Sequence, residues 1–311
     1  MPSMFHYTTN DGALGIIGSG QIFATHYKYL NDSLELKIAE SLISPLLEQG
    51  FKSAYDELSA AGELKGFAED NNIDIFQQQA EFLIRKSFDA GDYLSPVFLA
   101  SFCEHDPGSL QWDHGLLSQW RGYGSQGGCA LEFDVDLFQE KLNAEEKAHP
   151  YSPIAIGNVI YDDHSTCIDE VKIQDIAKLF VRRLRAKSHG IDISDLPGLD
   201  DLHDALFLIG PKLKHKSFME EKEVRIIAAP ALNPRGKKIY DKPEKKIEYR
   251  MKNGVPVPYI KLFDHGGELP IVRIIVGPQR EQSNVVQALR LILRSRKTEI
   301  EVVASAISFI P

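Results

Sequence analysis

The sequence predicts an α+β fold, in which strands near both ends of the chain surround helical segments. Three observations support this fold class: short β-prone runs open the chain, helical spacing dominates its middle, and a strand-rich stretch occupies its last third. At 311 residues the chain is long enough to bury a core of its own. We predict one domain over residues 1–311, with helical insertions at about 34–95 and 166–214.

The first 25 residues predict a strand, a short helix and a second strand. Residues 5–8 are β-prone and end before a polar stretch that suits a helix start. Leu14 and Ile17 would lie on the apolar face of the helix, which the glycines up to Gly20 would close. Residues 21–25 are the next β-prone run.

Helices are expected at several later positions. Asp32 and Glu35 belong to a segment with the spacing of a capping box, which predicts a helix from there toward residue 49. Further helices are predicted at 51–61, 66–89, 169–187, 200–214 and 280–295.

Strands alternate with these helices. Residues 97–103 and 129–134 are apolar runs typical of buried strands, and the residues between them predict a loop rich in Gly, Trp and Arg. Further strands are predicted at 154–161, 223–229, 246–251, 257–262, 271–276 and 299–303.

Charge and cysteine content limit the classes of protein. The net charge of −9 divides into −14 for residues 1–150 (23 acids, 9 bases) and +5 for residues 151–311 (21 acids, 26 bases). The basic half fits either a nucleic-acid partner or an ordinary solvated surface. The three cysteines form no CxxC pair, which argues against disulfides and cysteine-based zinc sites. Without an apolar run of about 20 residues or a signal peptide, we expect a cytoplasmic protein with no membrane role.

Four segments contain unusual combinations of polar and aromatic residues: 5–8, 24–33, 117–124 and 218–225. The order of these segments and the residues in them resemble the bacterial family catalogued as domain of unknown function 2971. Residues 274–278 near the end also fit, so the resemblance spans nearly the full chain. Membership in this family does not indicate which reaction, if any, the protein catalyses.

A second resemblance suggests a chemistry. A His in the first strand, aromatic residues after a short helix and a late Glu-x-Glu resemble the triad layout of ADP-ribosyltransferases, which implies a split β-sheet core and NAD as cofactor. The resemblance implies that His6 binds the ribose beside nicotinamide and that Tyr27 or Tyr29 stacks on the nicotinamide ring. It also implies that Glu223 or Glu221 holds the ribose 2′-hydroxyl.

The chemistry of that superfamily explains these residue types. Cleavage of NAD at the nicotinamide bond develops an oxocarbenium ion, which a carboxylate stabilises, while aromatic surface suits the nicotinamide ring. Glu221 and Glu223 are two residues apart, so on a strand both would point to one face. The resemblance ranks Glu223 as the catalytic carboxylate; the alternative is that both belong to the solvated face of a strand. Tyr7 and Thr8, beside His6, complete the expected cofactor contacts.

The loop motif supplies candidate anion ligands. Arg121 can hold a pyrophosphate through two parallel hydrogen bonds, and Ser118 and Gln119 can add neutral donors. Trp120 is interpreted as a packing residue. Arg225 fits either phosphate binding or pairing with a carboxylate, and both remain open.

The resulting hypothesis is nicotinamide release from NAD with transfer of ADP-ribose to a protein, a nucleic acid or water. Neighbouring families imply a role as a toxin or in defence against phage. One alternative is a catalytically inactive nucleotide sensor or interaction module. Another is a metal-dependent phosphodiesterase, whose loop-built metal site would use His105, Asp106, Asp113 and His114. The leading hypothesis needs no metal.

Overall fold

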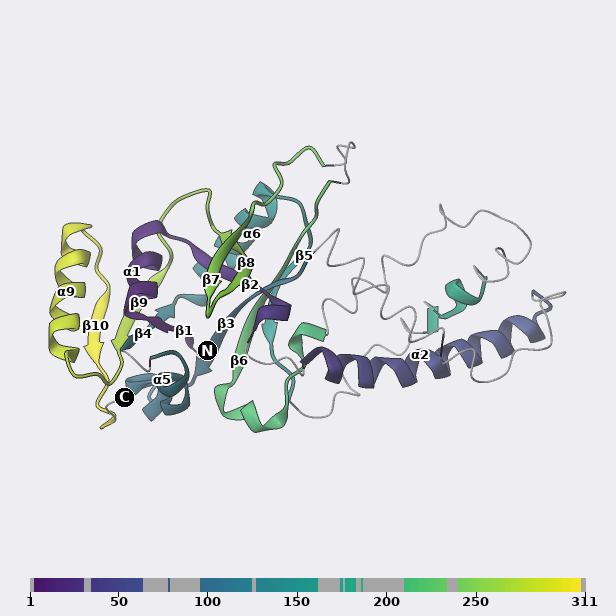
Figure 1. The fold of residues 1–311 in the computed structure, drawn as a ribbon, viewed down its shortest axis with the longest axis horizontal. Coiled ribbons are helices and arrows are strands. Elements are labelled where there is room, and N and C mark those ends of the chain that lie inside the picture. Colours follow the sequence, from purple (N-terminus) through teal and green to yellow (C-terminus); the bar gives the residue numbers. More distant parts are fainter. Residues whose placement is uncertain are drawn as a thin grey trace. The chain divides into compact units, whose positions relative to one another are not determined.

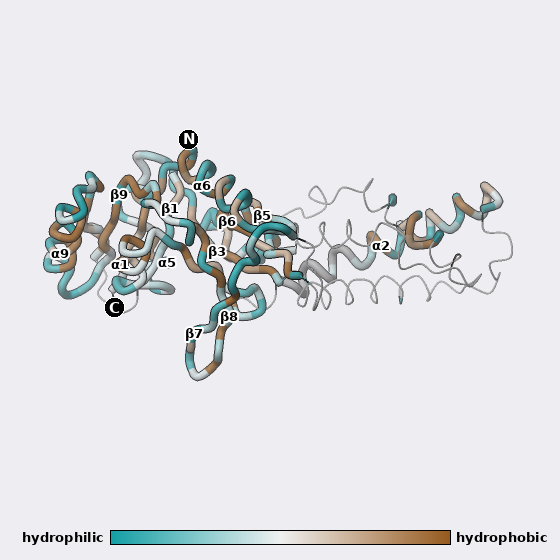
Figure 2. The backbone as a smooth tube through the Cα atoms, turned by 90° about the horizontal axis from the view of Figure 1, so that it is seen from above, coloured by the Kyte–Doolittle hydropathy of each residue, from teal (hydrophilic) through white to brown (hydrophobic). Residues whose placement is uncertain are grey.

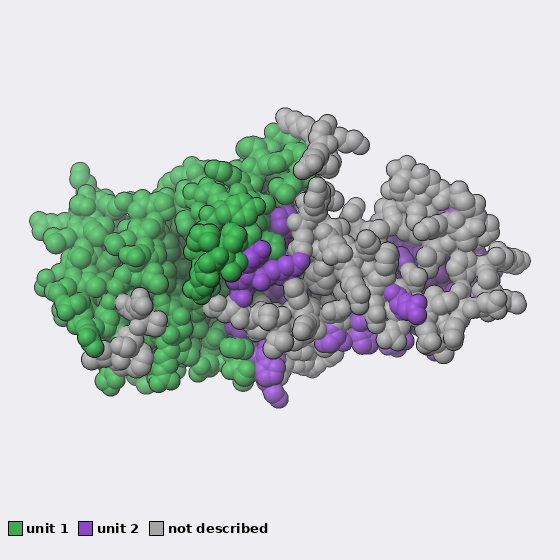
Figure 3. All heavy atoms as spheres, viewed as in Figure 1, with its two compact units in different colours: residues 1–26, 98–159, 217–311 green, residues 27–97, 160–216 purple. Residues whose placement is uncertain are grey.

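The computed structural model describes residues 3–30, 35–63, 78, 96–124, 127–161, 174–175, 177–182, 186, 210–233 and 240–308. The chain divides into two compact units, coloured separately in Figure 3. Unit 1 comprises residues 1–26, 98–159 and 217–311, and unit 2 comprises residues 27–97 and 160–216. Both predicted helical insertions fall within unit 2.

Unit 1 is built on a ten-stranded mixed sheet (Figure 1), which confirms the α+β class. The strands are β1 (Ser3–Thr9), β2 (Ile22–His26), β3 (Phe98–His105), β4 (Gly128–Phe133), β5 (Tyr151–Asn158), β6 (Glu223–Pro230), β7 (Ile247–Lys252), β8 (Val255–Leu262), β9 (Ile271–Val276) and β10 (Glu301–Ala304). The main order is β10-β9-β4-β1-β3-β2-β8-β7, with β6 on β3 and β5 on β6. Each strand overlaps one predicted from the sequence, because the apolar runs correspond to buried strands.

The sheet forks at β3. Along one edge, β3 pairs with β6 over Phe98–Cys103. Along the other edge it pairs with β1 at Cys103–His105 and with β2 at Phe98–Leu99. The chain therefore forms two branches, β1-β4-β9-β10 and β2-β8-β7, which part beside the middle of β3.

The two faces of the sheet carry different side chains, since successive residues of a strand point to opposite faces. The first face carries Met4, Phe102 and Val224 and packs against helices. These helices are α1 (Asn10–Ser19), α6 (Val135–Ala148) and α9 (Gln282–Ser295), whose buried residues join the same core cluster. The second face carries Phe5 and Cys103, which pack with residues of a short helix.

The caps of these helices follow from local sequence. The Thr9 hydroxyl accepts a hydrogen bond from Gly12 N and begins α1, and Gly20, in the left-handed conformation with φ of 67°, ends it. The Asp134 carboxylate accepts from Leu137 N and begins α6. The sequence analysis missed α6, although Asp134 is a strong N-cap residue.

The predicted loop between β3 and β4 is largely helical. It contains α4 (Leu110–His114), capped by Ser109, and α5 (Leu117–Tyr123). The prediction of a loop was wrong because the glycines of this segment suggested turns, whereas Gly115 and Gly124 each follow a short helix.

Unit 2 is mainly helical where it is described. The helix α2 (Glu35–Ala60) joins the two helices predicted at 34–49 and 51–61 into one, with Pro45 inside it. Phe51 contacts Phe180 with ring centroids 5.0 Å apart. The predicted helix at 66–89, the capping residue Asp32 and most of 169–187 and 200–214 lie outside the described residues.

No helix in the described part of the chain combines the length and apolar character needed to cross a bilayer. The longest, α2, contains glutamates and lysines along its length.

Candidate functional site

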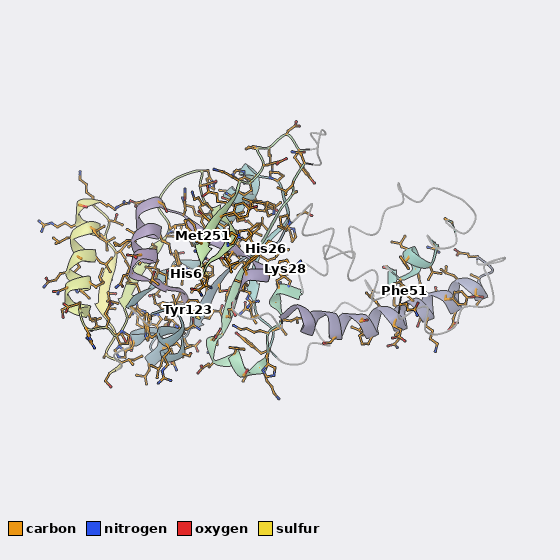
Figure 4. All side chains as sticks on the ribbon, viewed as in Figure 1. His6, His26, Lys28, Phe51, Tyr123 and Met251 are labelled. Carbon is orange, nitrogen blue, oxygen red and sulfur yellow. The ribbon has the colours of Figure 1, made fainter. Side chains whose placement is uncertain are left out.

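His6, labelled in Figure 4, lies at the fork of the sheet. It is two residues after Met4 in β1, so it belongs to the first face. The last residue of β1 that pairs with β3 is Phe5, so His6 follows at the point where the strands part. Its Nδ1 donates to the Ser101 carbonyl oxygen over 2.9 Å, and its ring is 5.4 Å from that of Phe102. Burial lowers the pKa of His6, which favours the neutral ring. His6 therefore provides a hydrogen bond to a backbone carbonyl of β3 at the point where β1 no longer pairs with β3.

Tyr7 points to the second face and links β1 to β3 and to the residue before α5. Its hydroxyl accepts from Leu116 N over 2.8 Å and lies 2.7 Å from Nε2 of His105. Burial lowers the pKa of His105 to about 4, so the ring is neutral and its Nε2 accepts a hydrogen bond from the Tyr7 hydroxyl. The Tyr7 hydroxyl thus has two protein partners, and burial raises its pKa.

The Tyr7 ring packs edge-on against Trp120 of α5, with centroids 4.8 Å apart. Trp120 is 1% exposed and donates from Nε1 to the His114 carbonyl. A Cβ atom at Gly277 would lie 2.7 Å from the nearest atom of this indole ring, and one at Gly115 would lie closer still. The interpretation of Trp120 as a packing residue agrees with this environment.

Glu223 and Arg225 form a buried ion pair on the second face. The Glu223 carboxylate accepts from Arg225 Nε over 2.7 Å and from Nη2 over 3.1 Å. The two residues are 4% and 2% exposed. In the β3–β6 ladder Glu223 stands opposite Cys103, and Arg225 stands opposite Ser101, the residue that His6 contacts. Arg225 therefore pairs with a carboxylate in the structure, which is one of the two roles that the sequence left open.

Two expectations about the glutamates need correction. Glu221 ends a 3₁₀ helix, η4 (Lys216–Glu221), and Lys222 has a positive φ of 41° before β6 begins at Glu223. The two glutamates therefore do not share one face of a strand. The register Phe5–Cys103–Glu223 places Glu223 on the second face, whereas His6 is on the first.

The other predicted cofactor contacts are distributed over the chain. Thr8 pairs with Cys129 in the β1–β4 ladder, on the same face as His6. Tyr27 and Tyr29 lie in a 3₁₀ helix of unit 2, η1 (Tyr27–Tyr29), where Tyr27 is buried and Tyr29 is 38% exposed. They are thus in a different unit from His6 and Glu223.

The candidate anion ligands predicted in the loop all lie on α5: Ser118, Gln119 and Arg121. Gln119 is buried and Arg121 is exposed. The Ser118 hydroxyl oxygen is the one buried side-chain oxygen or nitrogen atom without a hydrogen-bond partner in the described part of the chain. The α5 helix thus presents Arg121 outward and leaves one hydroxyl group unsatisfied.

The residues of the hypothetical loop-built metal site do not converge. His105 is bonded to Tyr7, and Asp106 pairs with Lys222 over 2.7 Å. The His114 Nδ1 faces the amide of Ala306 at 3.3 Å. Asp113 completes the predicted set, but it joins neither of its histidines in a group of ligand atoms. The long-range contacts of His105, Asp106 and His114 direct these side chains to separate partners, so the site that sequence spacing suggested does not form.

A different group has ligand atoms within 4.8 Å of one another: Glu145, His149 and Asp264, the one such group among the described residues. Lys245 occupies it. The Lys245 ammonium is 2.5 Å from Glu145 Oε1 and 2.7 Å from Asp264 Oδ1, and its side chain is fully buried. The protein thus supplies its own cation between these two carboxylates.

A cluster of contacting side chains on the second face was not predicted from the sequence. Arg250 of β7 donates to the Thr25 hydroxyl of β2 over 3.0 Å and lies 5.7 Å from the Tyr259 ring centroid. Phe23, which is 41% exposed, stacks on Tyr259 with centroids 4.6 Å apart. These residues are brought together by pairing of strands more than 200 positions apart, which local patterns do not reveal.

Comparison with known proteins identifies one family. Residues 119–226 match the family described as "Protein of unknown function (DUF2971)". The resemblance predicted from the motifs is confirmed over this span, which is about a third of the chain. The span runs from α5 into β6, so it includes Gln119, Arg121, Glu223 and Arg225 but not His6. No curated protein and no solved structure matches the chain.

Proposed function

We propose that this protein cleaves NAD at the nicotinamide glycosidic bond and transfers ADP-ribose to a protein, a nucleic acid or water, with Glu223 as the catalytic carboxylate. One observation carries the proposal: Glu223 is a carboxylate buried beside the fork of the sheet and held by two hydrogen bonds from Arg225. A fixed negative charge in a water-excluded site stabilises an oxocarbenium ion far better than the same charge in water.

In this proposal each residue near the fork has a different role in catalysis. Glu223 would accept a hydrogen bond from the ribose 2′-hydroxyl, while the two hydrogen bonds from Arg225 orient the carboxylate. His6 is a positioning residue, because it projects from the opposite face and binds the Ser101 carbonyl rather than sharing a surface with Glu223. A role as a toxin or in defence against phage belongs to the same proposal.

The test follows free nicotinamide by chromatography after the full chain is incubated with NAD, with and without cell extract as a source of acceptors. Glu223→Gln is expected to reduce nicotinamide release by about 100-fold or more, the size of effect seen when one electrostatic group is removed from a catalytic site. Release by the wild type that Glu223→Gln leaves unchanged would contradict the assignment.

A matched control exists on the same face of the sheet. Glu132 is 6% exposed and accepts from Arg273 Nε over 2.6 Å, so Glu132→Gln also breaks a buried Glu–Arg pair. The Glu132 pair fixes α4 through Trp112, whose indole nitrogen donates to Glu132 over 3.1 Å. Glu132→Gln is expected to retain nicotinamide release in the fraction of protein that is folded.

A second candidate is a nucleotide sensor without catalysis. The observation that favours it is that both Glu223 oxygens already accept from Arg225, which leaves the carboxylate less available to the ribose 2′-hydroxyl than catalysis requires. Calorimetry with NAD separates the two candidates. Binding without nicotinamide release supports the sensor, whereas release that depends on Glu223 supports the transferase.

A further inference from the structure

The strand β7 forms an edge of the sheet, and it exposes large apolar side chains. It is the last strand in the order of described strands, and it pairs with β8 through a turn at Asn253 and Gly254, both with positive φ. Figure 2 shows this hairpin extending beyond the neighbouring strands of unit 1. Tyr249 and Met251 of β7 are 68% and 69% exposed; Met251 is labelled in Figure 4.

The side chains of β7 separate by face. Ile247 packs against the core of the first face, so Tyr249 and Met251 follow it on that face. Glu248 and Arg250 lie on the second face, where Glu248 accepts from Lys261 over 3.0 Å. An accessible edge strand with apolar side chains invites pairing with another strand, and monomeric proteins usually avoid one.

We propose that β7 pairs in antiparallel fashion with β7 of a second copy of this chain, about a twofold axis at Tyr249. This register places Glu248 opposite Arg250 of the partner in two symmetric pairs. It also places Ile247 opposite Met251, and Tyr249 opposite Tyr249, on the apolar face. Opposite charges and apolar pairs directly across an antiparallel ladder are both stabilising.

Other registers of the same pairing are less favourable. A twofold axis at Arg250 places two arginines opposite each other, and an axis at Glu248 does the same with two glutamates. A shift by one residue joins the apolar face of one copy to the charged face of the other. The strand sequence Ile-Glu-Tyr-Arg-Met is therefore self-complementary in one register only.

The same register limits the length of the pairing. It sets Lys246 opposite Lys252 at each end, and like charges in that position oppose further pairing. Five paired residues bury little area compared with the roughly 1,200 Å² of a small stable interface, so the dimer is weak. A weak dimer forms and dissociates with protein concentration.

Sedimentation of the full chain over a range of concentrations tests the proposal. The wild type is expected to pass from monomer to dimer as concentration rises. Glu248→Arg and Arg250→Glu, each alone, place like charges across the axis and are expected to raise the dimer dissociation constant by about tenfold or more. The double variant restores opposite charges and is expected to restore dimerisation.

Two further variants keep the test decisive if the charge variants fold poorly. Met251→Lys changes an exposed side chain and is expected to weaken the dimer without affecting thermal unfolding. Leu291→Lys removes a side chain of nearly the same exposure, 67%, from α9 and is expected to leave dimerisation unchanged. A wild type that stays monomeric at every concentration overturns the proposal and leaves β7 to a strand of another protein. A folded double variant that stays monomeric also overturns it.

Discussion

His6 and Glu223 project from opposite faces of one sheet, although the strands that carry them are both neighbours of β3. His6 hydrogen-bonds the Ser101 carbonyl, whereas Glu223 binds Arg225 opposite Ser101. No contact joins the two side chains among the described interactions, so their contributions to folding should be independent.

Additivity of substitutions tests this independence. His6→Ala removes one hydrogen bond and is expected to lower the free energy of unfolding by about 1 kcal/mol, while Glu223→Gln leaves a buried Arg225 charge and costs about 3 kcal/mol. The double variant should lose the total of the two values to within about 0.5 kcal/mol. Urea denaturation measures all four proteins, and a coupling energy above about 1 kcal/mol would show that the two sites interact.

The packing of Trp120 can be tested with two glycines that both have positive φ but differ in what a Cβ atom would meet; Gly115 also has an extended ψ of 174°, which adds backbone strain of its own. Gly108 and Gly115 both have positive φ, 80° and 77°. A Cβ at Gly108 has no atom within 4 Å, whereas one at Gly115 meets the Trp120 indole. Gly108→Ala should cost about 1 kcal/mol of backbone strain, and Gly115→Ala about 1 to 3 kcal/mol more. Equal losses in urea denaturation would show that the indole moves aside freely.

Much of the fold was accessible from the sequence because its strands are short apolar runs with clear ends. The run Ile271–Val276 was predicted with its observed bounds. The missed helix α6 buries only two apolar side chains, Phe138 and Leu142, so its apolar periodicity was weak. Residues of the family-matched span, such as Gln119 and Arg121, were singled out by their motif.

The candidate site was harder to predict from the sequence because its geometry depends on the register between neighbouring strands. Whether His6 or Tyr7 shares a face with Glu223 is decided by one residue in the alignment of β1 with β3, and short motifs do not specify it. The role of Lys245 was equally hidden. In the sequence it belongs to a basic stretch, but its partners Glu145 and Asp264 lie on α6 and beyond β8.

Lys245 should be replaceable by a metal ion. Lys245→Ala leaves Glu145, which is fully buried, without its cation and should lower the free energy of unfolding by about 3 to 5 kcal/mol. It also opens space between two carboxylates and a histidine, a donor set that suits Zn²⁺. Added Zn²⁺ should then raise the melting temperature of this variant but not of the wild type.

The control for this rescue is Lys245→Ala combined with His149→Ala, which removes one of the three ligands. It should show little response to Zn²⁺. If Zn²⁺ stabilises neither variant, the three side chains are not held close enough, once Lys245 is gone, to bind a metal.

The buried His105 predicts a specific loss of stability in acid. Its pKa falls from 6.5 to about 4 in the folded protein because burial disfavours the charged ring. Between pH 6.5 and 4 the unfolded chain therefore binds a proton that the folded chain does not, so stability decreases as the pH falls through this window. The full loss from this residue is about 3 kcal/mol below pH 4.

His105→Gln removes the titrating group and keeps an oxygen that can accept the Tyr7 hydroxyl proton. The variant should be less stable than the wild type at pH 7.5, but its unfolding free energy should fall less steeply between pH 6.5 and 4. Urea denaturation at a series of pH values measures both slopes. His6, whose pKa burial also lowers, contributes in the same direction and remains in both proteins, so the difference between the slopes reports His105 alone. Identical slopes would mean that the ring of His105 gains a proton in the folded protein as readily as in the unfolded chain.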